Sequence, residues 1–219
     1  MSDPIIEVTV AAPVEVVWAA LRDPDQLRRW HGWVFEGLDE EIDFIYRQRS
    51  TADDEHHVLQ LTGAIPDARG DRFELTAVEG GTRVRIVRGP PPPPDHEWAG
   101  YYDDVTQGWV IFSQQLRFAI ERQPGRERRT VFVSAARPGA GPLTLPPELD
   151  GSPFFAVEGA RGVEVRVLGP GLVVAGQAAG KELLVISTYG LEQAAFTAVV
   201  DRVAAFWSAR HPDADPPSV

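Results

Sequence analysis

Hydrophobic positions near the N-terminus group into three short elements. The β-branched run IIEVTV at 5–10 predicts a strand. Pro13 suits the first turn of a helix, because its missing N–H costs nothing there. The residues that follow at helical spacing predict one apolar face: Val14, Val17, Trp18 and Leu21. Asp23 and Pro24 then begin a second short helix, which ends before Gly32.

Residues 42–89 alternate apolar and polar side chains in the way that is typical of an antiparallel meander. The predicted strands are IDFIYRQR at 42–49, HHVLQLTGA at 56–64 and the two arms of a hairpin at 71–89. Gly80 and Gly81 supply the turn of that hairpin. The prolines at 90–94 cannot continue a strand and predict a stiff polyproline connector.

The clearest helix is predicted at 103–122. Its apolar residues step by four, three, four and three positions: Val105, Trp109, Phe112, Leu116 and Ala119. Together with the elements before it, this helix predicts an α+β fold in which an antiparallel sheet packs on one long helix.

The second half repeats this pattern in shorter form. Strands are predicted at 130–135, 162–169, 172–180 and 182–188, and a helix at 191–209. We interpret residues 1–123 as one domain and 124–219 as a smaller unit of sheet plus helix. A reduced second copy of the first domain is an alternative interpretation of that unit.

Composition excludes several classes of protein. Residues 1–125 hold 12 Lys+Arg and 22 Asp+Glu, a net charge of −10 out of −11 for the whole chain, so nucleic acid is not an expected partner. The chain has no cysteine, no apolar run of membrane-spanning length and no secretory signal, which favours a cytoplasmic protein with no membrane partner. Nucleotide-binding glycine motifs and a nucleophile elbow are missing, and no cofactor is expected. His56 and His57 are adjacent in a predicted strand and would point to opposite faces, so no metal site is expected either.

Two segments carry a resemblance to a known family. VAAPVEVVWAALRDPDQLRRWHG at 10–32 resembles the opening of the SRPBCC (START-like, helix-grip) superfamily, and TQGWVIFSQQLRFAIE at 106–121 resembles its last helix. The nearest branch is similar to the bacterial homologues of the activator of the heat-shock-protein-ninety ATPase. The resemblance covers about residues 4–123. It implies a helix-grip fold, in which a curved sheet grips the long helix around an apolar cavity.

On that resemblance we expect a cavity that binds a small hydrophobic or aromatic molecule. Its expected lining is mostly aromatic: Trp30, Trp33, Phe44, Tyr46, Phe73, Trp98, Tyr101, Trp109, Phe112 and Leu116. His31 is a candidate polar contact at the mouth, and a structural histidine is the alternative. The alternative interpretation is that these aromatic rings simply fill the hydrophobic core.

Three functions are compatible with such a cavity. The first is ligand binding. The second is an enzyme of the cyclase or hydrolase type, and the third is a co-chaperone of the heat-shock protein. The predicted inner faces are almost wholly apolar, which favours binding over catalysis. A homodimer is a further expectation, because the last helix is apolar on more than one side: Phe196, Val199, Val200, Val203, Phe206 and Trp207.

That wide apolar surface predicts that residues 1–125 are not independent. We expect the helix at 191–209 to pack on its own sheet with one side, and on the first domain or a twin subunit with the other. Expressed alone, residues 1–125 should therefore associate or aggregate. A soluble, monomeric fragment with the thermal stability of the full chain would contradict this prediction.

Overall fold

The computed structural model describes residues 5–63, 69–97, 99–136, 145, 149, 151–166, 170–178 and 180–219. Contacts within the chain define two compact units. Unit 1 comprises Met1–His31 and Gly37–Gly125, and unit 2 comprises Gly32–Glu36 and Arg126–Val219. The short segment Gly32–Glu36, which lies inside the first domain on sequence grounds, thus belongs to unit 2 by its contacts.

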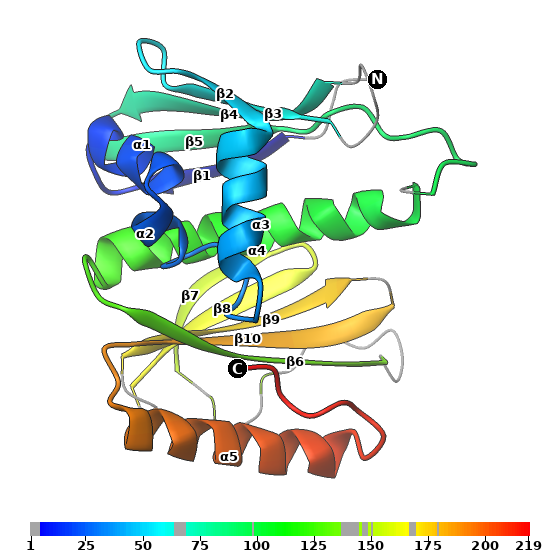
Figure 1. Cartoon of the computed structure of the whole chain (residues 1–219). Coiled ribbons are helices and arrows are strands. Elements are labelled where there is room, and N and C mark those ends of the chain that lie inside the picture. The colour runs from blue at the N-terminus through cyan, green and yellow to red at the C-terminus, as the bar shows by residue number, and fades with distance from the viewer. Residues whose placement is uncertain are drawn as a thin grey trace. The chain divides into compact units, whose positions relative to one another are not determined.

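Unit 1 is a five-stranded antiparallel sheet with one long helix along it (Figure 1). The strand order is β1-β5-β4-β3-β2, and the bounds are β1 Ile5–Val10, β2 Ser50–Asp53, β3 Val58–Thr62, β4 Arg69–Val78 and β5 Gly81–Val87. The helices are α1 Val14–Arg22, α2 Pro24–Leu27, α3 Leu38–Asp43, the π-helix η1 Phe44–Gln48, the 3-10 helix η2 Ala99–Tyr101 and α4 Tyr102–Arg122. The predicted α+β, helix-grip fold class is confirmed.

The long helix buries most of its predicted apolar stripe. Trp109, Leu116 and Ala119 are buried, and Phe112 is half-buried. Val105 is 44% exposed, because it lies in the first turn of α4, close to the open end of the sheet.

The strand predicted at 42–49 is wrong. The chain instead turns through Gly37, with φ of 102°, into α3 and then η1. Leu38, Ile42 and Tyr46 are all buried and are spaced four apart, which is helical spacing. The alternation of Ile42, Phe44 and Tyr46 satisfies a strand equally well, so the periodicity of this short stretch is ambiguous.

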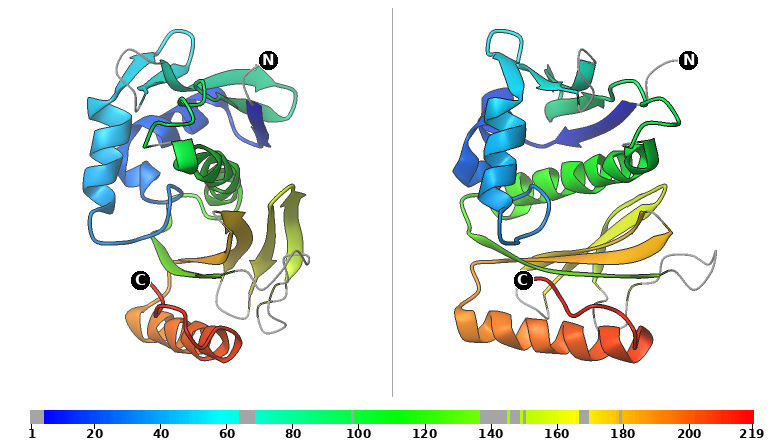
Figure 2. Two further views of the ribbon diagram at one scale, coloured as in Figure 1. Left: turned by 90° about the vertical axis from the view of Figure 1, so that its right-hand side faces the viewer. Right: turned by 45° about the vertical axis from the view of Figure 1, so that its right-hand side comes forward.

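Unit 2 is a second five-stranded antiparallel sheet with a helix along one face (Figure 2). Its order is β6-β10-β9-β8-β7, and the bounds are β6 Arg128–Ala136, β7 Ser152–Val157, β8 Ala160–Val165, β9 Gly171–Ala178, β10 Lys181–Tyr189 and α5 Gln193–Arg210. The four predicted strands are confirmed. Strand β7 was missed because it contains Pro153, a residue that sheets tolerate at an edge.

Helix α5 is apolar on a narrower face than its sequence indicated. Phe196, Val199, Val203 and Trp207 are buried in the core of unit 2, whereas Val200 and Phe206 are half-buried against it.

The two sheets share one strand order. In each unit the first strand pairs with the fifth, the remaining strands follow as a meander, and a long helix comes after the last strand. This common order supports the interpretation of unit 2 as a reduced second copy of unit 1, which stays a prediction. No helix in the described ranges is long and apolar enough to cross a membrane.

A close approach of β3 and β4 generates the first structural prediction. A Cβ added at Gly70 would lie 2.5 Å from the Leu61 backbone oxygen, so the strands must move apart in Gly70→Ala. We expect this substitution to lower the free energy of unfolding by about 1–3 kcal/mol, measured by urea denaturation. Gly100→Ala is the matched control, since nothing lies within 4 Å of its added Cβ. Equal stability of the two variants would contradict the prediction.

Candidate functional site

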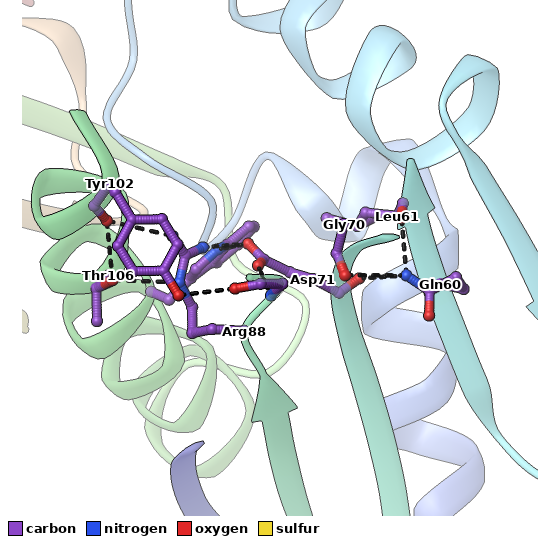
Figure 3. Close-up of polar contacts among 9 residues, drawn as sticks. Gln60, Leu61, Gly70, Asp71, Arg88, Tyr102 and Thr106 are labelled. Carbon is purple, nitrogen blue, oxygen red and sulfur yellow. Dashed lines mark hydrogen bonds and ion pairs between the residues drawn. The ribbon is translucent and has the colours of Figure 1, made fainter. Parts of the chain in front are cut away.

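A cavity of about 160 Å³ lies at the open end of unit 1, between the sheet and the start of α4. Figure 3 shows the polar contacts among several of its lining residues. Its lining comes from the end of β3, the start of β4, the segment after β5 and the first turn of α4: Leu61, Thr62, Gly63, Arg69, Gly70, Asp71, Arg88, Gly89, Pro90, Pro92, Tyr101, Tyr102 and Val105. Like the cavity expected from the sequence, this one lies between the sheet and the long helix. Of the expected lining residues that the structure describes, only Tyr101 lines this cavity.

Two charged side chains of the lining are largely buried and paired. The Asp71 and Arg88 side chains are 13% and 4% exposed, and an Arg88 Nη1–H donates to Asp71 Oδ2. The hairpin register explains their meeting: Arg72 pairs with Val87, so the residues one step further toward the open end face one another. The geometry of the hairpin therefore places opposite charges at the mouth of the sheet.

Asp71 collects donors from three elements. Its Oδ1 accepts from the Gly89 backbone N–H at 2.9 Å, and its Oδ2 accepts from Trp109 Nε1–H at 2.6 Å as well as from Arg88. These bonds tie the end of β5 and the helix α4 to β4.

Arg88 is bound on its other sides by the start of α4. Its Nε–H donates to Thr106 Oγ1 and an Nη2–H donates to the Tyr102 backbone oxygen, both at 3.2 Å. The guanidinium carbon lies 4.6 Å from the centre of the Tyr102 ring, a cation–π contact. The Tyr102 hydroxyl in turn donates to the Gly89 backbone oxygen at 2.7 Å.

Close backbone contacts shape the floor of the cavity. Gly70 and Gly89 leave no room for a Cβ, which would lie 2.5 Å from Leu61 O and 2.4 Å from Arg69 O respectively. The Gln60 side-chain amide donates to the backbone oxygens of Leu61, Gly70 and Asp71, at 2.8, 3.1 and 3.2 Å. It thereby satisfies carbonyls where the register of β3 and β4 shifts.

Most of the aromatic residues expected to line a cavity pack on one another instead. We call them the aromatic cluster: Trp30, His31, Tyr46, Phe73, Trp109 and Phe112. Their rings meet mainly edge to face, with centroids 5.1 Å apart for Phe73 and Trp109 and 6.0 Å apart for Trp30 and Tyr46. Leu116 is 1% exposed in the same unit. Trp30 also contributes to a second cavity.

His31 lies inside the aromatic cluster with both ring nitrogens hydrogen-bonded. It is 1% exposed, and its Nε2 lies 2.9 Å from Glu41 Oε1 and its Nδ1 3.0 Å from the Tyr46 hydroxyl. The neutral ring satisfies both contacts when Nε2–H donates to Glu41 and Nδ1 accepts from Tyr46. His31 is not among the lining residues of the cavity at the open end. This placement is that of a structural histidine.

Burial raises the pKa of the Tyr46 hydroxyl well above its ordinary value, and the negative charges of Glu41 and Asp71 raise it further. Tyr46 therefore remains a hydrogen-bond donor to His31 at neutral pH. The hydroxyl proton of Tyr46 thus makes the hydrogen bond to His31 inside the aromatic cluster.

The other predicted site residues lie elsewhere. Phe44 is 51% exposed on η1. Trp33 belongs to unit 2, where its ring stacks on Phe132 with centroids 3.9 Å apart. Trp98 lies outside the described residues. Tyr101 is 57% exposed at the rim of the cavity.

A second cavity in unit 1, of about 220 Å³, lies beside α1, α2 and the end of α4. It is lined by Val16, Ala20, Gln26, Arg29, Trp30, Ala119, Ile120, Pro124 and Gly125. Among the described residues no group of three or more His, Asp or Glu side chains could hold a metal ion. His56 and His57 lie in the turn between β2 and β3 and not in a strand.

Sequence reasoning missed Asp71, Arg88 and Tyr102 as site residues. One signal could have found the first two. Once the hairpin turn is placed at Gly80, counting outward along both arms sets Asp71 opposite Arg88. Opposite charges facing each other at the end of a hairpin are candidates for an ion pair.

Comparisons with known proteins establish no family for the chain. No protein-family model and no curated protein matches the sequence. Among solved structures, DynU16 from the dynemicin biosynthetic locus is 16% identical, covers 95% of this chain and 96% of its own, and has a TM-score of 0.35. CalU16 from Micromonospora echinospora is 18% identical over 55% of this chain and 75% of its own, with a TM-score of 0.37. The Aha1 dimer from Colwellia psychrerythraea is 20% identical over 57% of this chain and 100% of its own, with a TM-score of 0.37.

The raised pKa of Tyr46 predicts a loss of stability in alkali. The folded state retains a proton that the unfolded state releases above about pH 10, so this contribution is complete below pH 10 and is lost as pH rises through the folded pKa. In Tyr46→Phe we expect a stability cost of about 1 kcal/mol at pH 7, from the lost bond to His31. Above pH 10 the slope of stability against pH should be shallower than in the wild type, by at most about 1.4 kcal/mol per pH unit.

Urea denaturation between pH 7 and 11 checks this expectation. Tyr189, whose pKa burial also raises, is present in both proteins and so cancels in the comparison. Parallel slopes for the wild type and Tyr46→Phe would contradict the assignment.

Proposed function

We propose that the chain binds a small, mainly apolar molecule carrying an aromatic ring in the cavity at the open end of unit 1. The observation that carries the proposal is a hollow with largely apolar walls over a buried, hydrogen-bonded ion pair. Its volume of about 160 Å³ is close to the roughly 150 Å³ of an engineered apolar cavity that holds benzene. The size therefore suits a single substituted ring.

The walls have the composition of a small-molecule site. Leu61, Pro90 and Val105 contribute aliphatic surface, and the tyrosines of η2 and α4 contribute ring surface: Tyr101 and Tyr102. Ligand pockets combine such apolar walls with a few placed polar groups, and here Asp71 and Arg88 are those groups.

Binding is favoured over acid–base catalysis by the state of these polar groups. Asp71 already accepts hydrogen bonds from Gly89, Trp109 and Arg88. A general base needs a lone pair that reaches the substrate proton, and a carboxylate engaged in this way acts as a positioning group. His31, the other candidate, is bonded to Glu41 and Tyr46 within the aromatic cluster. The cyclase or hydrolase alternative thus lacks a side chain that is placed to act as a general base, whereas binding requires none.

Trp109 provides a direct report of occupancy. Its indole N–H donates to Asp71, which lines the cavity. Titration with toluene should therefore shift the Trp109 indole N–H resonance in a ¹⁵N–¹H spectrum, in a saturable way. Trp109→Phe assigns the resonance, and the indole of Trp18, which donates to Asp54 Oδ1 at 3.0 Å, should not move.

A cavity-filling variant tests the location. Val105 lines the cavity and is 44% exposed, so Val105→Phe should fill space without disturbing the core and should abolish the saturable shift. Val157→Phe is the matched control, because Val157 is also 44% exposed but lies on β7 of unit 2. Binding that survives in Val105→Phe, or a toluene titration that moves no resonance, would refute the proposed site.

A further inference from the structure

We propose that Arg88 makes this site selective for ring compounds that carry a hydrogen-bond acceptor, such as an aryl ketone, over hydrocarbons and over amines. The inference rests on the proposed function. It assigns to Arg88 the recognition of the ligand's polar end, in addition to its role in holding the open end of unit 1 together.

The first support is a count of donors. A guanidinium has five N–H groups in a fixed plane. Three of those of Arg88 are used, by Thr106, Asp71 and the Tyr102 backbone oxygen. Within the described part of the chain, the remaining two have no hydrogen-bond acceptor. Because Arg88 lines the cavity and its side chain is only 4% exposed, a bound acceptor would satisfy donors that water reaches poorly.

The second support is that the hydrogen bonds within unit 1 already use three of the four lone pairs of the Asp71 carboxylate. Its Oδ2 accepts from both Arg88 and Trp109, and its Oδ1 accepts from the Gly89 amide. A ligand ammonium would find only one lone pair left on the Asp71 carboxylate, and it would meet the positive charge of the Arg88 guanidinium. The cavity therefore disfavours a cation.

The start of α4 adds to the same preference. The side chain of the N-cap residue, Tyr101, makes no capping hydrogen bond to this 21-residue helix, and Tyr102 and Val105 of the first turn line the cavity. A helix N-terminus carries a partial positive charge that attracts acceptors. Asp103 and Asp104 lie in the same turn and reduce this field, but they are not lining residues. The helix thus reinforces Arg88 without forming a site of its own.

Three probes with one carbon skeleton test the inference. Ethylbenzene has no polar group, acetophenone has a carbonyl oxygen at the same position, and 1-phenylethylamine has an ammonium there at pH 7. In the wild type, titrations followed by the Trp109 indole resonance should give about tenfold tighter binding of acetophenone than of ethylbenzene. 1-Phenylethylamine should bind most weakly.

Arg88→Lys separates recognition from the ion pair. Lysine keeps a positive charge beside Asp71 but lacks the planar array of donors, so the ratio of acetophenone affinity to ethylbenzene affinity, measured in the same variant, should fall toward unity. Arg85→Lys is the matched control: Arg85 lies on β5, three residues before Arg88, pairs with Glu74 and is not a lining residue. It should leave the preference unchanged.

The outcomes distinguish the two proposals. Saturable binding of ethylbenzene and acetophenone with equal affinity overturns the role of Arg88 and leaves the proposed function intact. Tightest binding of 1-phenylethylamine overturns the inference. A preference for acetophenone that persists in a folded Arg88→Lys also overturns it, because a group other than Arg88 would then recognise the carbonyl. Failure of all three probes to bind overturns the proposed function itself. If circular dichroism shows Arg88→Lys to be unfolded, the wild-type probe series decides alone.

Discussion

The buried ion pair between Asp71 and Arg88 is the interaction on which the open end of unit 1 depends. Strand β5 ends one residue before Arg88, and the prolines that follow cannot extend the sheet. The Gly89 amide, which would otherwise lose its partner, donates to Asp71. Trp109 donates to the same carboxylate, so one side chain links β4, the end of β5 and α4. Removing either charge would leave the other buried alone, at a cost of about 3–5 kcal/mol.

The Asp71–Arg88 ion pair also helps to explain why the cavity lies at the open end of unit 1. Hydrogen bonds of Arg88 and Trp109 fasten the end of the sheet to α4, and the prolines after β5 end the sheet there, while the aromatic cluster fills the interior behind the cavity. Trp30 packs within this cluster, whereas Trp33 stacks on the ring of Phe132 in unit 2.

The aromatic cluster contains its own polar core. The chain Glu41–His31–Tyr46 satisfies both nitrogens of a histidine that is 1% exposed, and the Gln115 amide donates to the Trp30 backbone oxygen at 2.9 Å. Buried polar groups of this kind specify one arrangement of the rings, because any repacking would break hydrogen bonds in a medium of low dielectric constant. The helical turn that carries Glu41 and Tyr46 is therefore part of the packing of the cluster.

Elements with a long or regular pattern could be predicted from the sequence. The stripe of α4, the hairpin at Gly80 and the strands of unit 2 follow from local periodicity and turn chemistry, which need no partner to be recognised. The remaining features depend on tertiary contacts. Residues 42–48 fit both a strand and a helix, and burial of Ile42 and Tyr46 selected the helix. Whether a ring lines a cavity or packs against another ring depends on contacts between residues far apart in the sequence, such as that of Phe73 with Trp109. The pairing of Asp71 with Arg88 likewise forms only when the hairpin closes, because the register of the two strands decides which side chains face each other.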